Sequence, residues 1–297
     1  MNNPLEQLHI LDLTNRLPGP LAVSHLATLG ARVYKPRKVI DSDPFKNSKV
    51  EIFEHWHKQF TNKVEILDQE IKTIVEDKNI SIILYTKSFK SEVEQLKKIK
   101  GHLYFLEIKA SDNPLLTALH DLNALANTNL LMIHLNSLRE SGARMNSPLP
   151  APMIPLAGVQ FASKISMMLL AGYLKCQQTK QHIWHSCSLD QTIKEFAELI
   201  FPKNRIGPFL PNGANPCYLI YPLQEENYFL VVAAIEEKYW KIFLEHINIK
   251  DEILDRFDES GKVIEKISKV LKTMSYQKFQ NDVLLGKCLS LISLPKM

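Results

Sequence analysis

The apolar residues near the start of the chain form a short run typical of a buried strand. His9–Leu13 is apolar except for Asp12, which predicts a mostly buried strand. The sequence Pro-Gly-Pro at residues 18–20 then turns the chain, and Pro20 suits the first position of a helix, where no N–H donor is needed. We therefore expect a strand, a tight loop and the start of a helix.

A helix and a second strand are predicted after this turn. Apolar residues at positions 22, 26 and 29 are spaced three or four residues apart, which predicts one buried helical face. Gly30 is placed to end the helix in a left-handed conformation, and Val33 begins the next strand. The stretch Leu8–Lys38 is thus predicted to be one β-α-β unit that opens a parallel sheet.

Strand and helix patterns continue to alternate through residue 200. Two further apolar runs, Ser81–Tyr85 and His102–Ile108, predict buried strands, and the amphipathic stretch Glu92–Ile99 between them predicts a helix. A strongly apolar helix is expected over Lys164–Leu174, where methionines are more often core residues than part of a cofactor site. This alternation is typical of an α/β fold built on a parallel sheet.

The C-terminal part of the chain follows a different pattern. Phe201–Asn215 is rich in Pro, Gly and Asn, which is typical of a linker. Cys217–Pro222 and Tyr228–Ala234 predict a two-stranded hairpin, followed by a helix with Trp240 and Phe243 facing inward. The predicted organisation is a large α/β domain over residues 1–200, a linker over 201–215 and a small α+β domain over 216–297.

Composition and charge exclude several classes of protein. A chain of 297 residues with 45% hydrophobic residues can bury a sizeable core. Its net charge of +4 slightly favours anionic ligands, but without a clustered basic face it does not indicate nucleic-acid binding. No signal peptide and no membrane-spanning apolar run is visible. We therefore expect a cytoplasmic protein that binds neither nucleic acid nor membrane.

The spacing of cysteines and histidines gives no sign of a metal site. The four cysteines lie far apart without C-x-x-C spacing, which favours a reducing compartment over disulfides or zinc. His182, His185 and Cys187 have short, mixed spacing on a predicted strand, which favours a structural interpretation. No metal is therefore predicted, and no glycine-rich dinucleotide or phosphate-binding loop occurs either.

Two groups of residues could carry chemistry. Lys35, Arg37 and Lys38 follow the second predicted strand, where open α/β sheets bind ligands, so they could meet phosphate charge; otherwise they are a solvated charge run. His120, within Ala118–Leu131, carries an imidazole suited to proton transfer near neutral pH. A lone histidine on a helix is otherwise a surface or packing residue.

Four segments with distinctive motifs occur in order along the chain. They are D-L-T, P-G-P and L-G-A within Leu8–Lys38, H-D-L-N from His120, P-L-A-G ending at Gly158, and the hairpin segment from Pro216 to Trp240. Together they resemble the family III CoA-transferases, whose relatives include α-methylacyl-CoA racemase. The resemblance implies a Rossmann-like parallel-sheet domain plus a smaller α+β domain.

The resemblance implies coenzyme A or an acyl-CoA thioester as the ligand. In the family, cationic side chains at the end of the second strand meet the nucleotide end of CoA, and the matching positions here are Lys35, Arg37 and Lys38. The segment Asn62–Glu70 resembles a further basic segment of the family but keeps only Lys63, which reduces the positive charge offered to CoA.

The resemblance also implies an acid-base site. His120 matches a racemase histidine that exchanges the proton α to the thioester carbonyl. Glu236 matches a carboxylate that supports this histidine across a dimer interface, or else it is a helix-start carboxylate favoured by the helix dipole. The family aspartate, which is a nucleophile or a second acid-base group, is replaced by Gly158, and no Asp or Glu occurs between Glu140 and Asp190.

This replacement sets the expected activity. Loss of one general acid or base costs about two to four orders of magnitude in rate. Loss of a covalent nucleophile removes the double-displacement route of the transferases altogether. The sequence therefore predicts that transferase and racemase activities are impaired or lost.

Three functions remain open at this point. The leading interpretation is an acyl-CoA binder near the racemase branch, a pseudoenzyme of the family. The second is an active enzyme on acyl-CoA thioesters that uses His120, and the third is an interaction protein without CoA. The family forms interlocked homodimers, so the resemblance implies a homodimer here. Ser275–Pro295 is similar to the family segment after which a further stretch closes the ring, so interlocking stays open.

Overall fold

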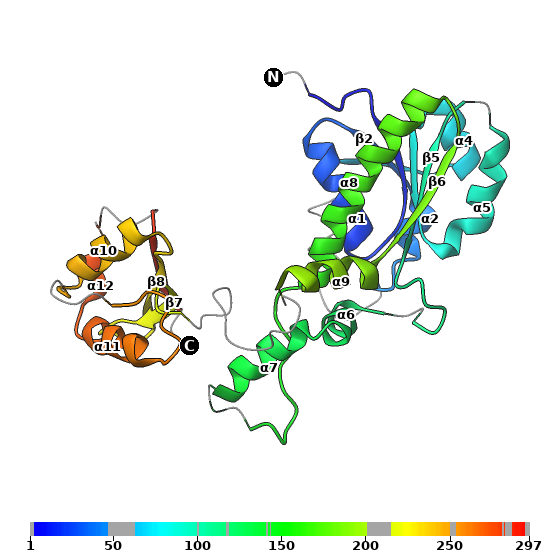
Figure 1. Cartoon of the computed structure of the whole chain (residues 1–297). Helices are drawn as coiled ribbons and strands as arrows, with labels where there is room; N and C mark the ends of the chain where they lie inside the picture. The colour runs from blue at the N-terminus through cyan, green and yellow to red at the C-terminus, as the bar shows by residue number, and fades with distance from the viewer. Residues whose placement is uncertain are drawn as a thin grey trace. The chain divides into compact units, whose positions relative to one another are not determined.

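The structure is a computed structural model that describes most of the chain. The described residues are 3–46, 63–99, 101–116, 119–140, 142, 144–200, 215–249, 254–280, 282 and 287–294. The chain divides into two compact units, residues 1–199 and residues 200–297 (Figure 1). The predicted linker lies outside the described residues except for Asn215, which is buried.

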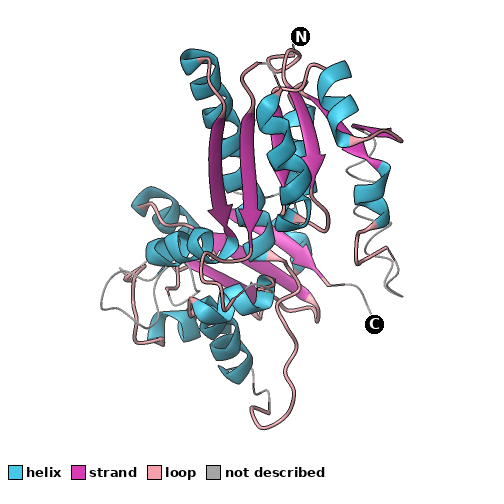
Figure 2. Ribbon diagram, turned by 90° about the vertical axis from the view of Figure 1, so that its right-hand side faces the viewer, coloured by secondary structure: helices cyan, strands magenta, loops and turns pink. Residues whose placement is uncertain are grey.

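The first unit is built on a six-stranded sheet. Its strands are β1 (His9–Leu13), β2 (Arg32–Pro36), β3 (Val64–Leu67), β4 (Ile82–Tyr85), β5 (Tyr104–Lys109) and β6 (Ile183–Ser188). All pairs are parallel, in the order β3-β2-β1-β4-β5-β6 (Figure 2). This is the doubly wound order in which the direction of winding reverses between β1 and β4, and ligands bind at the carboxyl end of such a switch point.

Helices cover both faces of this sheet. The helices of the first unit are α1 (Pro18–Thr28), α2 (Arg37–Asp41), α4 (Ile71–Asp77), α5 (Lys90–Gln95), α6 (Asp121–Asn127), α7 (Leu130–Glu140), α8 (Leu156–Thr179) and α9 (Leu189–Ile200), with 3₁₀ turns η1 (Lys87–Phe89) and η2 (Leu96–Lys98), and α6 and α7 lie beyond the end of the sheet (Figure 1). Ile74 of α4 and Val93 of α5 share one buried cluster with Leu11, Ile83 and Phe105 of the strands. Helices α1 and α8 pack together on the opposite face (Figure 1).

The predicted β-α-β unit forms, with two differences in its helix. Helix α1 begins at Pro18, so Pro20 is its third residue and not its first. Leu29 was expected on the buried face, but it is the C-cap and is 46% exposed, because the helix ends before it. Gly30 has φ +103°, as a left-handed helix end requires, and a β-carbon there would lie 2.4 Å from Asn3 Cβ.

Two other predicted helices differ in their extent. The helix expected over Glu92–Ile99 begins at Lys90 and tightens into the 3₁₀ turn η2. The helix expected over Lys164–Leu174 is the middle of α8, which has 24 residues. Helix α8 approaches β5 closely at Gly172, where a β-carbon would lie 2.1 Å from Tyr104 Cζ, so only glycine fits there without movement.

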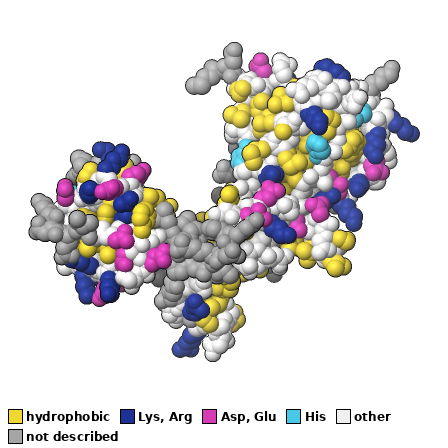
Figure 3. Space-filling model, in the orientation of Figure 1, with side chains coloured by type: hydrophobic (Ala, Val, Ile, Leu, Met, Phe, Trp, Pro, Cys, Tyr) yellow, Lys and Arg dark blue, Asp and Glu magenta, His cyan; other side chains and the backbone are white. Residues whose placement is uncertain are grey.

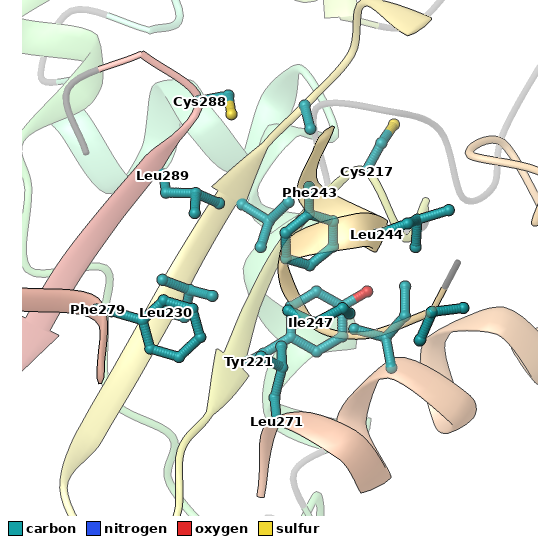
Figure 4. Packing of buried hydrophobic residues seen from close by; sticks show 14 of the residues in the cluster. Cys217, Tyr221, Leu230, Phe243, Leu244, Ile247, Leu271, Phe279, Cys288 and Leu289 are labelled. Carbon is teal, nitrogen blue, oxygen red and sulfur yellow. The ribbon is translucent and has the colours of Figure 1, made fainter. Parts of the chain in front are cut away.

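The second unit is a three-stranded antiparallel sheet with three described helices. It comprises β7 (Tyr218–Pro222), β8 (Tyr228–Ala233), β9 (Leu289–Ser293), α10 (Glu237–His246), α11 (Lys262–Leu271) and α12 (Tyr276–Gln280). Its core joins Tyr221 and Leu230 of the sheet to Phe243, Leu271 and Phe279 of the helices (Figure 4). The predicted hairpin is confirmed, with Tyr221 opposite Leu230, and Trp240 and Phe243 face inward as expected.

Candidate functional site

The loop after β1 is held by a buried acid. Asp12 is 1% exposed and accepts hydrogen bonds from the backbone N–H of Thr14 at 2.9 Å and from the Thr14 hydroxyl. The third donor is Lys35 Nζ of β2, at 2.7 Å from Asp12 Oδ2. A β-carbon on Gly19 would lie 1.9 Å from Thr14 Oγ1, so the start of α1 fits closely over this loop.

The ammonium group of Lys35 is hydrogen-bonded to two groups inside the protein. Its ammonium donates to Asp12 and to the carbonyl of Thr14, and its side chain is only 7% exposed. The predicted contact of Lys35 with CoA would therefore require these interactions to break. A buried pair of this kind neutralises charge inside the sheet, and separating it is costly.

Arg37 and Lys38 lie at the surface, in the first turn of α2. Arg37 Nε lies 3.0 Å from both carboxylate oxygens of Asp68, and Lys38 Nζ lies 3.4 Å from Glu70 Oε2. Asp68 and Glu70 follow β3, the neighbour of β2 in the sheet. Exposed ion pairs are worth only about 0–1 kcal/mol, so an incoming anion can open them.

His120 lies at the N-cap of α6 and is exposed. Its backbone N–H donates to Asn123 Oδ1 at 3.3 Å, so Asn123 helps to cap the helix that follows the histidine. The asparagine of the H-D-L-N motif therefore has a structural role, which is to cap the helix. The role of the His120 ring in proton transfer stays a prediction.

The acid after His120 reaches α8. Gly158, in the first turn of α8, donates its backbone N–H to Asp121 Oδ1 at 2.7 Å, and the amide of Ala157 also hydrogen-bonds this carboxylate. Burial raises the pKa of the Asp121 carboxyl above its ordinary value, although both amides act to lower it. The start of α6 and the start of α8 thus meet through one carboxylate.

The space at position 158 is small and partly occupied. A β-carbon on Gly158 would lie 3.1 Å from Leu17 Cδ2 and 3.6 Å from Asp121 Oδ1. Leu17 belongs to the loop between β1 and α1, so Gly158 lies near the carboxyl end of the central strand. The nearest neighbours of a side chain at position 158 would therefore be a methyl group of Leu17 and the carboxylate of Asp121.

Glu236 lies in the second unit, at the N-cap of α10, and is exposed. Its carbonyl accepts hydrogen bonds from the N–H groups of Tyr239 and Trp240, both at 3.0 Å. These bonds start the helix through the backbone, and the side chain makes no capping bond. The support that Glu236 would give to His120 stays a prediction.

His182, just before β6, and His185, within it, make contacts inside the first unit. His182 Nδ1 accepts from the Leu103 N–H at 3.0 Å, and its Nε2 lies 3.2 Å from the carbonyl oxygen of Ile99. His185 Nδ1 lies 3.3 Å from the Tyr104 hydroxyl. These partners agree with a structural interpretation, and among the described residues no group of three potential metal ligands comes together.

The cysteines are buried free thiols at positions 176, 187, 217 and 288. Burial raises the pKa of the Cys187 thiol to about 12, which makes it a poor nucleophile at neutral pH. Over the described part of the chain, no helix combines the length and apolarity needed to cross a membrane.

The sequence alone assigned no role to Asp121, although the residue was part of the matched H-D-L-N motif. Its bond to Gly158 joins residues 37 positions apart, and no local pattern encodes such a contact. The available signal was indirect: Asp121 directly follows His120, and the segment around Gly158 has no acid of its own.

Comparison with known proteins bears on the fold. No family model matches the sequence, and no curated protein matches it significantly. Among solved structures, the hypothetical protein Rv3272 from Mycobacterium tuberculosis is 14% identical with a TM-score of 0.67, over 99% of this chain and 84% of that one. An aspartate-to-alanine variant of Rv3272 is 13% identical with a TM-score of 0.68, over 99% and 82% of the two chains.

A second neighbour carries a family name. A CAIB/BAIF family protein from Brucella suis is 11% identical with a TM-score of 0.65, over 100% of this chain and 85% of that one. At these identities the likeness concerns the fold. The chain has the family III CoA-transferase fold, a parallel-sheet unit with a small antiparallel unit, and this prediction is confirmed.

Proposed function

We propose that this protein binds a CoA thioester at the carboxyl edge of its parallel sheet and does not transfer CoA through a covalent carboxylate. The observation that carries the proposal is Gly158 in the first turn of α8, beside the loop that follows β1. Glycine offers no nucleophile there. The fold supports a CoA thioester as the ligand, and Gly158 supports the loss of the transferase route.

The binding half of the proposal rests on Arg37 and Lys38. Both follow β2 at the edge where open α/β sheets take ligands. Their present partners, Asp68 and Glu70, are 72% and 82% exposed in their side chains, so the pairs can exchange with phosphate at little cost. The nucleotide end of CoA supplies the phosphate charge that these cations would take.

Calorimetric titration with CoA and with acetyl-CoA tests this proposal. Wild-type protein should bind, with an affinity that falls as salt is raised, since the contacts are to phosphate. The double substitution Arg37→Gln and Lys38→Gln should weaken binding by about 10- to 100-fold, which corresponds to about 1.4–2.8 kcal/mol. Lys262→Gln, in the second unit, is the matched control and should leave the affinity unchanged.

Failure to bind would point to a different class of protein. If neither ligand binds at millimolar concentration, the interaction-protein interpretation replaces this one. If both ligands bind but the double variant binds equally well, the ligand lies elsewhere and the proposed edge is wrong.

A second candidate function keeps the chain an enzyme that moves the proton α to the thioester carbonyl. The specific observation in its favour is the carboxylate of Asp121, the residue directly after His120. This carboxylate accepts a hydrogen bond from the backbone amide of Gly158. Proton transfer needs no covalent nucleophile, so the glycine removes the transferase route and leaves this one open.

We also propose that the protein is a homodimer. Helix α8 bears exposed apolar side chains along its outer face, among them Val159, Met167 and Leu174, and Figure 3 shows hydrophobic surface over this part of the first unit. Exposed apolar surface of this kind often marks an interface. Sedimentation velocity should give twice the mass of one chain, and a monomer at micromolar concentration would refute the proposal.

A further inference from the structure

The carboxylate of Asp121 lies where two helices begin. Asp121 is the first residue of α6, and its side chain accepts hydrogen bonds from the first-turn amides of α8 at Gly158 and Ala157. The N-terminus of α8, a helix of 24 residues, favours a negative charge at this point. The oxygen Oδ1 lies only 3.6 Å from where a β-carbon on residue 158 would be, so Asp121 brings a carboxylate to a position that has no side chain of its own.

The direction of α8 places this carboxylate at the carboxyl edge of the sheet. Gly158 lies against Leu17, just before α1, and eight residues later Ser166 Oγ donates to the carbonyl of Ala22 within α1 at 3.1 Å. The contacts advance in the same direction along both helices, so α1 and α8 run parallel and start at the same edge (Figure 1). That edge is the one at which doubly wound sheets hold ligands.

The electrostatic setting of Asp121 suits proton exchange. Burial favours the neutral carboxyl and raises its pKa, while the two amides stabilise the ionised form. A carboxyl whose pKa is raised in this way keeps its proton to a higher pH than an exposed aspartate does. His120, the preceding residue, is exposed and places an imidazole at the start of the same helix.

We propose that Asp121 and His120 together form the proton-transfer pair for the α carbon of a bound CoA thioester, with Asp121 as the carboxylate of the site in place of a side chain at 158. The inference deepens the proposed function and rests on it, because it needs the thioester to bind. It differs from the transferase chemistry of the fold, since no bond forms between the protein and the acyl group.

The proposed step is a balanced proton exchange. The basic member of the pair takes the proton from the α carbon, the C–H bond breaks, and its electron pair moves toward the thioester carbonyl to give an enolate. The acidic member then returns a proton to the same carbon and the enolate collapses. Each member ends in the other's starting state of protonation, and exchange with solvent resets both.

The substitution Asp121→Asn separates this role from helix capping. Asparagine keeps an oxygen that can accept the Gly158 and Ala157 amides, so α8 stays capped, but it cannot carry the exchanged proton. The matched control is Asp258→Asn in the second unit. The Asp258 carboxylate likewise accepts backbone amides at a helix start, from Ser260 and Val263, both at 3.1 Å.

Solvent-to-substrate deuterium exchange is the assay. Propionyl-CoA, isobutyryl-CoA and phenylacetyl-CoA are incubated with the full chain in D₂O, and loss of the α-proton signal is followed by NMR. Wild type should exchange at least one probe above the background without protein, and Asp121→Asn should slow it by about 100-fold or more. Asp258→Asn should exchange at the wild-type rate, and all three proteins should melt within a few degrees of each other.

The pH profile gives a readout that capping alone would not move. The exchange rate of wild type should change with pH as a carboxyl group titrates above the usual aspartate range. This pH dependence should be absent from any residual exchange rate of Asp121→Asn. Equal rates in wild type and Asp121→Asn overturn the inference. Absence of exchange with every probe, while CoA still binds in the titration, also overturns it and leaves the proposed function intact; absence of CoA binding overturns both.

Discussion

Replacing Lys35 with methionine tests the buried charge pair beneath the proposed site. Methionine keeps most of the aliphatic volume but removes the ammonium that lies 2.7 Å from Asp12 Oδ2. The two side chains are 7% and 1% exposed, so the remaining carboxylate has little access to water. Removing one partner of a buried pair costs about 3–5 kcal/mol.

The structure places the expected cost at the low end of this range. Asp12 keeps two donors after the substitution, the backbone N–H and the hydroxyl of Thr14, which partly compensate the orphaned charge. We therefore expect a loss of about 3 kcal/mol, a large part of the roughly 5–15 kcal/mol by which domains are stable.

Hydrogen exchange followed by mass spectrometry measures this loss where it occurs. Peptides that cover β1 and β2 should exchange about 100-fold faster in Lys35→Met, since each 1.4 kcal/mol is worth a factor of ten. Lys38→Met is the matched control, because its pair with Glu70 is 3.4 Å long and both side chains are well exposed, so it should change stability by about 1 kcal/mol or less.

Equal protection of these strands in wild type and Lys35→Met would refute the reasoning. In that case Lys35 would be free to meet phosphate, and its substitution should weaken CoA binding instead. The double variant Asp12→Asn with Lys35→Met adds a second check. It should recover part of the lost stability, because no buried charge is then left without its partner.

Three further predictions concern packing and the carboxylate of the site. Gly172→Ala should destabilise the first unit by about 1–3 kcal/mol in urea denaturation, because its β-carbon would overlap the Tyr104 ring, whereas Ala171→Ser on the exposed side of α8 should be nearly neutral. Because the folded pKa of Asp121 is raised, its contribution to stability is lost as pH rises from 3.8 through that raised pKa, so Asp121→Asn should gain stability relative to wild type as pH rises through this interval; a constant difference would contradict this. Gly158→Asp should be less stable at neutral pH than Gly158→Asn, since two carboxylates would then meet near Asp121, and the difference should vanish in acid; equal melting temperatures at both pH values would contradict it.

The elements with strong local signals were predictable from the sequence. The runs at β1 and β4 are short and almost wholly apolar because both faces of the central strands are covered, and this pattern led to a parallel sheet. The hairpin of β7 and β8 was predictable in the same way. Element ends were less predictable: α8 extends well beyond its apolar middle, and β9 falls in a segment to which no strand had been assigned.

The interpretation of Lys35 as a surface cation shows a different limit. A charge run next to a strand suggests solvent, yet Lys35 is one of four consecutive buried residues of β2, whereas Arg37 and Lys38 lie beyond the strand, in α2. A signal for this was present, because Asp12 lies within an apolar strand and a buried acid needs a partner. Which cation pairs with Asp12 depends on the register of β1 with β2, and this register cannot be predicted from the sequence alone.

The charges along the carboxyl edge restrict how a CoA thioester can lie there. The amides at the start of α8 already bind the Asp121 carboxylate, so a phosphate cannot use that helix end without displacing it. Arg37 and Lys38 are paired only with exposed acids, which a phosphate can replace. We therefore expect the phosphates beside α2 and the acyl group toward α6 and α8. In that orientation the same ligand would meet cations at its charged end and His120 and Asp121 at its reactive end.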